Sequence, residues 1–157
     1  MRSRAFPFIA AVLALALNSV PAFAQPKDSL LGTWVLDLAK SEFDPDPQIQ
    51  GRTIIFEAKD GGISFLQKTV TGAGNTATSD YVAKYDGKDA PITSPQLDTV
   101  SLKRIDENTV ERTGKIAGKA VETSTLVVSN GGKTLTITTK GSIKGTDYRS
   151  LQVFDKQ

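Results

Sequence analysis

The residues best suited to hold a ligand are polar side chains that alternate with apolar ones along short, β-like segments. Arg104 follows Val100 and Leu102 at intervals of two residues, and Arg112 follows Val110 in the same way. Side chains two residues apart lie on the same face of a strand, so each guanidinium is predicted to share a face with apolar side chains. A buried arginine without a partner is unfavourable. An inward arginine therefore predicts a carboxylate, an ordered water cluster or the anionic head of a ligand.

Two further segments show the same alternation. Residues 146–155 place Tyr148, Gln152 and Phe154 on one face, and residues 76–85 place Tyr81 and Tyr85 on one face. Apolar members would line a pocket, and the few polar members would orient a small ligand. The predicted ligand-binding residues are therefore Arg104, Arg112, Gln152, Phe154, Tyr148, Tyr81 and Tyr85.

Both arginines also admit a surface interpretation. Arg104 follows Lys103 and precedes a turn, where a solvated side chain is expected. Arg112 follows Glu111 directly, and a surface cross-strand ion pair is the alternative to a ligand contact there.

The residue types that the chain lacks limit the possible chemistry. There is no histidine and no cysteine among the 157 residues, which excludes a Ser-His-Asp triad, a histidine-ligated haem and nearly every catalytic zinc arrangement. Asp44 and Asp46 flank Pro45, but two acids without a third ligand fall short of a calcium site. We predict no catalytic residue, no metal site and no cofactor.

The first 24 residues have the pattern of a secretory signal peptide. Arg2 and Arg4 precede an apolar run, and Ala22-Phe23-Ala24 forms a small-x-small cleavage site. Cleavage after Ala24 predicts a periplasmic or secreted protein with one domain at residues 25–157 and no stable membrane span; an uncleaved signal anchor is the alternative. Loss of the two arginines leaves 17 basic against 17 acidic residues, given 19 and 17 in the whole chain. Zero net charge and no basic block argue against nucleic acid as a partner, and a monomer is expected.

The rest of the chain reads as short strands separated by glycine, aspartate and asparagine turns. Ala39 to Gly51 contains two prolines and is expected to be a loop, with at most one helical turn over Ala39 to Phe43. Regularly spaced strands with such turns are typical of an antiparallel sandwich or barrel, and closure into a barrel removes exposed edges. The prediction is an all-β, up-and-down antiparallel barrel of roughly eight to ten strands with little helix outside the signal peptide. The expected strands span 32–38, 52–59, 63–70, 76–85, 89–93, 99–105, 109–116, 119–129, 133–140 and 146–155.

Both ends of this strand series resemble the calycin superfamily of lipocalins and fatty-acid-binding proteins. The resemblance rests on Gly32-Thr33-Trp34 in the first strand and Gln152-Val153-Phe154-Asp155-Lys156 in the last. It implies structural roles for Gly32 and Trp34, with Trp34 closing the barrel floor. It also implies that a basic residue near the last strand packs over the tryptophan, a role that Arg149 could take. On a regular strand, however, Arg149 and Gln152 cannot both point inward.

The intracellular lipid-binding proteins of this superfamily differ from the chain in two respects. Their last strand often carries an Arg-x-Tyr pair that holds a ligand carboxylate, whereas Gln152 and Phe154 occupy the matching positions here. Glutamine also occurs there in the retinol-binding branch, which implies a neutral polar head group. The family also covers its barrel mouth with two helices between the first two strands, and Ala39 to Gly51 is too short for both.

Three functions are compatible with these features. The first is a non-catalytic, lipid-like binding protein for a small apolar or amphipathic ligand. The second is a filled barrel that acts as an interaction protein, such as a protease inhibitor, and inserts the loop at Ser41 to Gln50 or the leader at Gln25 to Leu31. The third is a cofactor-free isomerase or cyclase, which requires a perturbed acid or tyrosine in the cavity. A cavity supports the first function, and a packed interior with an exposed ordered loop supports the second.

Overall fold

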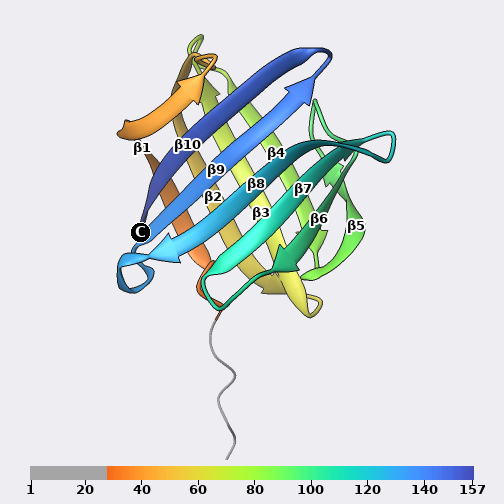
Figure 1. Ribbon diagram of the computed structural model, residues 1–157. Coiled ribbons are helices and arrows are strands. Elements are labelled where there is room, and N and C mark those ends of the chain that lie inside the picture. The colour runs from red at the N-terminus through yellow and green to blue at the C-terminus, as the bar shows by residue number, and fades with distance from the viewer. Residues whose placement is uncertain (1–27) are drawn as a thin grey trace, which may run out of the picture.

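The strands of the computed structural model, which describes residues 28–157, close into one antiparallel barrel (Figure 1). The order around the barrel is β1-β10-β9-β8-β7-β6-β5-β4-β3-β2, so every strand pairs with its neighbours in sequence and β1 closes on β10. The up-and-down barrel predicted from the sequence is confirmed, with ten strands. The predicted signal peptide at residues 1–24 lies outside the described residues. The strands are β1 (Gly32–Asp44), β2 (Ile49–Lys59), β3 (Gly62–Thr71), β4 (Thr76–Ala83), β5 (Asp86–Thr93), β6 (Thr99–Arg104), β7 (Thr109–Ile116), β8 (Lys119–Ser129), β9 (Thr134–Ile143) and β10 (Thr146–Lys156), and a single 3-10 turn, η1 (Asn130–Gly132), follows β8.

Tight turns set the strand order. In the β2–β3 hairpin, Lys59 pairs with Gly62 across Asp60 and Gly61, whose φ angles are 52° and 74°. Positive φ at both turn residues gives the turn a twist that matches the right-handed twist of the strands. The β7–β8 and β9–β10 hairpins have the same geometry at Ala117-Gly118 and Lys144-Gly145. These turns place consecutive strands side by side around the barrel.

The first strand is longer than the sequence predicts. Residues 39–43, expected to form at most one helical turn, belong to β1 but contain a bulge, because the register against β10 shifts between Asp37 and Glu42. The Asp37 carboxylate accepts backbone hydrogen bonds from two bulge residues at 3.0 and 3.2 Å, and Ser41 Oγ accepts one from the Val153 N–H at 3.0 Å. These side chains replace the ladder bonds that the bulge interrupts. The expected loop over residues 39–51, with its possible helical turn, was therefore wrong except at residues 45–48, between β1 and β2.

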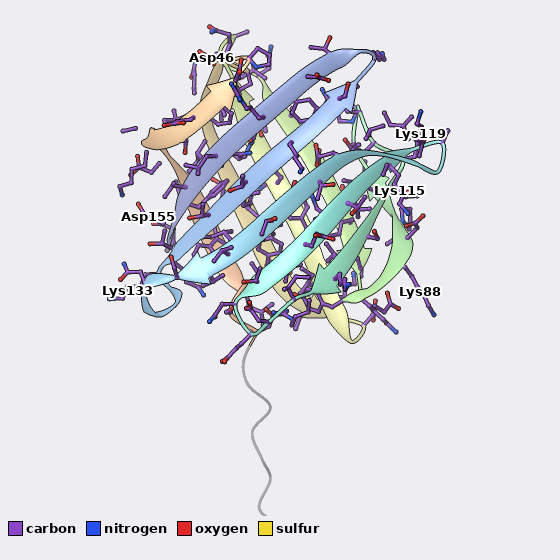
Figure 2. All side chains as sticks on the ribbon, in the orientation of Figure 1. Asp46, Lys88, Lys115, Lys119, Lys133 and Asp155 are labelled. Carbon is purple, nitrogen blue, oxygen red and sulfur yellow. The ribbon has the colours of Figure 1, made fainter. Side chains whose placement is uncertain are left out.

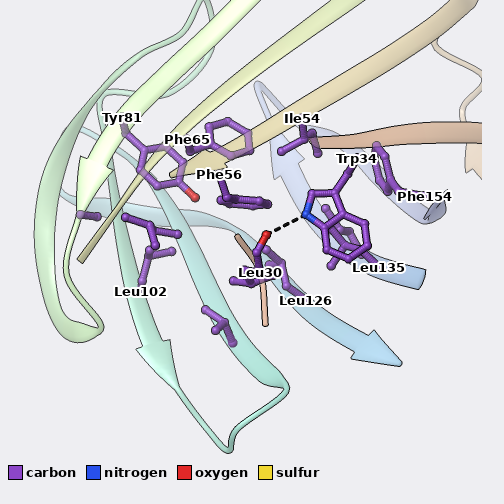
Figure 3. Packing of buried hydrophobic residues seen from close by; sticks show 14 of the residues in the cluster. Leu30, Trp34, Ile54, Phe56, Phe65, Tyr81, Leu102, Leu126, Leu135 and Phe154 are labelled. Atoms are coloured by element: carbon purple, nitrogen blue, oxygen red, sulfur yellow. Dashed lines mark hydrogen bonds between the residues drawn. The ribbon is translucent and has the colours of Figure 1, made fainter. Parts of the chain in front are cut away.

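The apolar core fills the end of the barrel where the described chain begins (Figure 3). Trp34 is completely buried there, and its indole N–H donates to the Leu30 carbonyl oxygen at 2.7 Å. Leu30 itself is 1% exposed, so the segment before β1 closes the floor of the barrel. The Phe56 and Phe65 rings pack at 5.4 Å between centroids just above this floor.

Charged side chains cover the outer surface, as Lys88, Lys115, Lys119, Lys133 and Asp155 illustrate (Figure 2). Lys115 on β7 pairs with Asp89 on β5 at 2.7 Å. Over residues 28–157, no helix is long and apolar enough to cross a membrane.

Candidate functional site

A cavity of about 450 Å³ lies inside the barrel, above the packed floor. Four apolar side chains line its lower part: Ile54, Phe65, Leu126 and Ile137. The β1–β2 and β5–β6 loops contribute rim residues, including Pro45, Pro47 and Leu97. Between these apolar regions the wall is polar, with side chains from both sides of the barrel: Arg52, Gln67, Ser79, Tyr81, Arg112, Glu122, Thr139, Tyr148, Ser150 and Gln152.

Arg52 is a cationic group of the cavity that has no acidic partner within residues 28–157. It lies on β2, where alternation places it on the same face as Ile54 and Phe56, both 1% exposed. Its Nε donates to Thr69 Oγ1 at 3.0 Å, and its Nη1 donates to Gln152 Oε1. Both acceptors are neutral. Burial, together with the charge of Arg112, lowers the pKa of Arg52 from 12.5 to about 10, although Glu122 partly offsets this.

Arg112, in contrast, has a carboxylate partner. Its Nη2 forms an ion pair with Glu122 Oε1 on β8, and the side chains of the two residues are only 16% and 10% exposed. Tyr148 on β10 donates from Oη to Glu122 Oε2 at 2.5 Å, so both oxygens of the carboxylate are used. Burial and this hydrogen bond raise the pKa of the Tyr148 hydroxyl, so it remains a protonated donor at neutral pH.

One glycine makes room for this cluster. Gly141 on β9 pairs in register with both Glu122 and Tyr148. A Cβ at Gly141 would lie 2.6 Å from Tyr148 Oη and 2.7 Å from the Val121 carbonyl oxygen. Tyr148 therefore reaches Glu122 by crossing the face of β9 where that strand has no side chain.

Tyr81 completes the polar wall. It lies on β4, is 3% exposed and stacks on Phe65 with 4.6 Å between ring centroids. Burial raises the pKa of Tyr81 to about 12, against the opposing effect of the nearby Arg112 guanidinium. Within residues 28–157, neither Tyr81 Oη nor Arg112 Nε has a hydrogen-bond partner, although both are buried.

The structure places four of the seven predicted ligand-binding residues around the cavity: Tyr81, Arg112, Tyr148 and Gln152. Their side chains point inward, and the surface interpretation of Arg112 is wrong because its partner is the buried Glu122 rather than an exposed acid. Phe154 does point inward, but it is fully buried in the floor core below the cavity.

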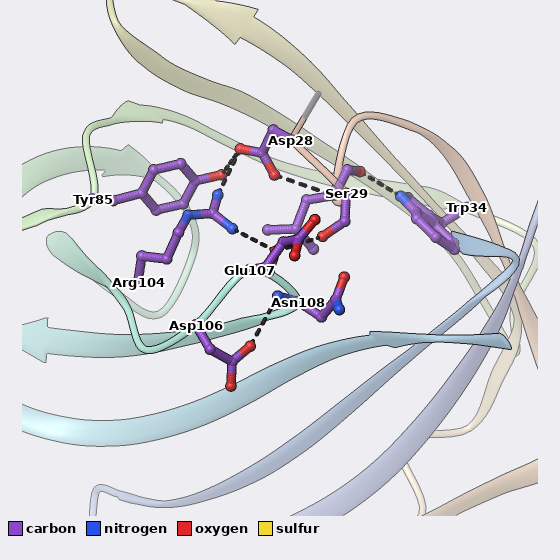
Figure 4. Close-up of polar contacts among 9 residues, drawn as sticks. Asp28, Ser29, Trp34, Tyr85, Arg104, Asp106, Glu107 and Asn108 are labelled. Atoms are coloured by element: carbon purple, nitrogen blue, oxygen red, sulfur yellow. Dashed lines mark hydrogen bonds and ion pairs between the residues drawn. The ribbon is translucent and has the colours of Figure 1, made fainter. Parts of the chain in front are cut away.

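Arg104 and Tyr85 lie beside Asp28, in the segment that precedes β1 (Figure 4). Asp28 Oδ2 accepts hydrogen bonds from Arg104 Nη2 at 2.6 Å and from Tyr85 Oη at 2.5 Å. The Arg104 guanidinium also lies 3.9 Å from the centroid of the Tyr85 ring. Neither residue lines the cavity, so the prediction that they belong to the ligand site was wrong. Through Asp28 they hold the segment before β1 against the barrel.

The basic residue over Trp34 is Lys156 and not Arg149. Lys156 Nζ lies 4.7 Å from the centroid of the indole ring, within the range of a cation–π contact. A Cβ at Gly32 would lie 2.7 Å from Lys156 Cε, so the absence of a side chain there admits the lysine. Arg149 points outward at the rim and pairs with the exposed Asp44 at 3.0 Å. Alternation along β10 explains the difference, because Arg149 and Gln152 lie on opposite faces.

Six residues of the polar wall were not predicted, and two of them, Arg52 and Glu122, are charged. The signal was present in both cases: Arg52 precedes Ile54 and Phe56, and Glu122 precedes Leu126 and Val128, all at even intervals. Each lies near the end of its strand, where a charged residue is usually taken as solvated.

Comparisons with known proteins support the fold. No family model matches the sequence, and no curated protein matches it. Among solved structures, the zebrafish ileal bile acid-binding protein, in a complex with cholic acid, superimposes with a TM-score of 0.50 at 10% sequence identity, over 82% of this chain and 99% of that one. At this identity the likeness is one of fold. Together with the closed ten-strand barrel, it confirms the calycin-like fold inferred from Gly32-Thr33-Trp34 and the meander.

Proposed function

We propose that this protein binds a small amphipathic molecule with an anionic head group inside the barrel, without catalysing a reaction. The observation that carries the proposal is Arg52, a largely buried guanidinium whose partners are the neutral Thr69 and Gln152. Below the rim, the cavity lining holds two guanidinium groups and one carboxylate, and that carboxylate, Glu122, already pairs with Arg112. An anion at Arg52 would balance the remaining charge.

The shape and lining of the cavity support an amphipathic ligand. The lower wall and the rim are apolar, and the polar groups lie between them. One structural neighbour, the zebrafish ileal bile acid-binding protein, was solved with cholic acid, a small amphipathic molecule. Gln152, which suggested a neutral head group, accepts a hydrogen bond from Arg52, so Arg52 supplies the charge that the last strand lacks.

The other two functions receive less support. A filled barrel would have a packed interior, whereas this barrel contains a cavity of about 450 Å³ with a polar wall. An isomerase or cyclase that used tyrosine as a base would need a lowered pKa, whereas burial raises the pKa of both Tyr81 and Tyr148. These tyrosines are better suited to donate hydrogen bonds.

Calorimetric titration with dodecanoate and dodecanol tests the proposal, because these ligands share a chain and differ in the charge of the head group. We expect dodecanoate to bind more tightly, and Arg52→Met to weaken dodecanoate binding by about 10- to 100-fold, the range for a hydrogen bond to a charged group. Dodecanol binding should change little. Lys68→Met, at an exposed position on β3, is the matched control for loss of a positive charge. Equal affinity for the two ligands, or equal effects of the two substitutions, would refute the anion site.

We also propose that the protein is exported and processed after Ala24, on the basis of the sequence pattern of residues 1–24. Cell fractionation followed by intact mass measurement tests this. A cytoplasmic protein that retains its first 24 residues would contradict the proposal.

A further inference from the structure

Gln67 and Ser79 are two neutral polar side chains of the cavity wall that the anion site at Arg52 does not use. They pair in register on β3 and β4. Alternation places them on the inner face of the sheet, in the row above the stacked rings of Phe65 and Tyr81 (Figure 3). Both side chains line the cavity and both are half-buried, so a ligand in the cavity can reach them.

Each of these side chains has a hydrogen-bonding group that the described part of the chain leaves unused. Gln67 Nε2 donates to Thr69 Oγ1 at 3.4 Å, which orients the amide and leaves its carbonyl oxygen, Oε1, as a free acceptor. The Ser79 hydroxyl forms no hydrogen bond within residues 28–157. A ligand that covers such groups without offering a partner loses the hydrogen bonds that they make to solvent.

A hydroxyl group is the ligand group that complements this pair. Gln67 Oε1 can only accept a hydrogen bond, and the Ser79 hydroxyl is available to donate one, so the partner needs a donor and an acceptor on one oxygen. A hydroxyl has both, whereas a carbonyl oxygen would pair with Ser79 alone. A carboxylate oxygen only accepts, and it would face the Gln67 carbonyl oxygen without a donor between them.

The pair lies at a defined depth below the anion site. Arg52 pairs in register with Thr69 across β2 and β3. Gln67 lies two residues further along β3, on the way to Phe65 in the apolar lower wall. Two residues of a strand span about 7 Å. A ligand with its head at Arg52 and its tail on the lower wall therefore passes Gln67 and Ser79 with the middle of its chain.

We propose that Gln67 and Ser79 form a second subsite, which binds a hydroxyl group in the middle of the ligand. The proposal rests on the anion site at Arg52 and deepens it: the ligand is an amphipathic acid that is hydroxylated part-way along its apolar body, and not an unsubstituted fatty acid. A site with unpaired hydrogen-bonding groups selects strongly for ligands that supply the missing partner.

The test compares dodecanoate with its mid-chain hydroxy, mid-chain oxo and terminal hydroxy derivatives by calorimetric titration. We expect at least one mid-chain hydroxy acid to bind about tenfold more tightly than dodecanoate, as one or two added hydrogen bonds allow. The matching oxo acid should gain less, because it can pair only with Ser79. The terminal hydroxy acid should gain nothing, because its hydroxyl group lies beyond the pair.

Ser79→Ala and Gln67→Met each remove one member of the pair, and either variant suffices if the other fails to fold. Each should reduce the advantage of the mid-chain hydroxy acid. The affinity for dodecanoate should stay within about twofold, because Arg52 keeps both of its acceptors. Ser142→Ala, the same change at an exposed position on β9, should keep the advantage.

The outcomes separate this subsite from the proposed function. If dodecanoate binds at Arg52 and no mid-chain isomer binds more tightly, the second subsite is refuted while the proposed function stands. The subsite is also refuted if the terminal isomer gains as much as the mid-chain isomers, or if the advantage persists in both Ser79→Ala and Gln67→Met. If none of the acids binds, the anion site and the second subsite are both refuted.

Discussion

Replacing Arg52 by methionine should leave the stability of the protein without ligand nearly unchanged, although it removes a half-buried side chain that makes two hydrogen bonds. The pKa of Arg52 falls from 12.5 to about 10 in the folded state, which corresponds to about 3 kcal/mol of unfavourable free energy for the charged form. The substitution removes this term. It also removes two charge-assisted hydrogen bonds, to Thr69 and Gln152, a loss of about 1.5 kcal/mol for each bond. The two contributions nearly cancel, so we expect the free energy of unfolding to change by no more than about 1 kcal/mol.

The penalty that Arg52→Met removes depends on pH. A cation whose pKa is lowered by folding destabilises the fold at every pH at which it is charged in both states, so this penalty is complete well below pH 10. As the pH rises through the folded pKa, Arg52 loses its proton, the penalty fades, and Arg52→Met should become less stable relative to the wild type. Measurements at pH 7 therefore capture the full effect.

Arg112→Met is the matched control in the same cavity, and it should destabilise the protein. Its loss would leave the 10%-exposed Glu122 without its ion-pair partner, and removing one member of a buried pair typically costs about 3 to 5 kcal/mol. Urea unfolding followed by the fluorescence of Trp34, the only tryptophan, measures both variants. A loss of more than about 2 kcal/mol for Arg52→Met would show that the fold itself compensates Arg52, and would refute the reasoning that assigns this residue to an anionic ligand.

Three other perturbations test separate parts of the structure. Gly141→Ala should destabilise the barrel by about 1 to 3 kcal/mol, because the added Cβ would overlap Tyr148 and the Val121 carbonyl. Gly51→Ala is the control: its added Cβ would have no atom within 4 Å, so it should be nearly neutral in the same urea unfolding experiment. Asp28→Ala should cost about 1 to 3 kcal/mol and shift Trp34 fluorescence towards that of an exposed indole, since it releases Arg104 and the segment before β1; an unchanged spectrum would contradict the role of Asp28 in closing the floor. Absorbance titration should show no tyrosine ionising near pH 10 in the folded protein, because burial raises the pKa of all three tyrosines, that of Tyr81 to about 12. The free energy of unfolding should fall as the pH rises above 10, where the tyrosines of the unfolded state ionise first. A tyrosine transition near pH 10 in the folded protein would contradict this.

The fold was largely predictable because its determinants are local. The turn residues and the two-residue alternation mark each strand in the printed sequence, and the strands then pair in order around the barrel. The first strand shows where such reasoning fails. Its bulge depends on Asp37 and Ser41, whose side chains replace backbone bonds to a strand more than 100 residues later, and no local pattern records that pairing.

The site was only partly predictable, because the identity of a partner depends on register between strands. Alternation correctly placed Arg112, Tyr148 and Gln152 on inward faces. Alternation alone did not distinguish the cavity from the floor, so Arg104 and Arg112 looked equivalent, although Arg112 lines the cavity and Arg104, two residues beyond its pairing position on β6, binds Asp28 at the floor. It also could not identify Lys156 as the cation over Trp34, because that contact requires the approach of β10 to Gly32.

At both ends of the barrel interior an arginine and a tyrosine bind the same carboxylate, and Arg52 does not belong to either group. At the floor, Arg104 and Tyr85 share the carboxylate of Asp28. In the cavity, Arg112 and Tyr148 share that of Glu122. Each cluster combines one arginine, one carboxylate and one tyrosine, so its charge is balanced within the fold. Among the described residues Arg52 has no such set, and its neutral partners leave a half-buried positive charge facing a cavity large enough for a small molecule. The same protein that balances two interior arginines leaves the third unbalanced at the place where a ligand fits, which is the pattern expected if the missing carboxylate belongs to the ligand.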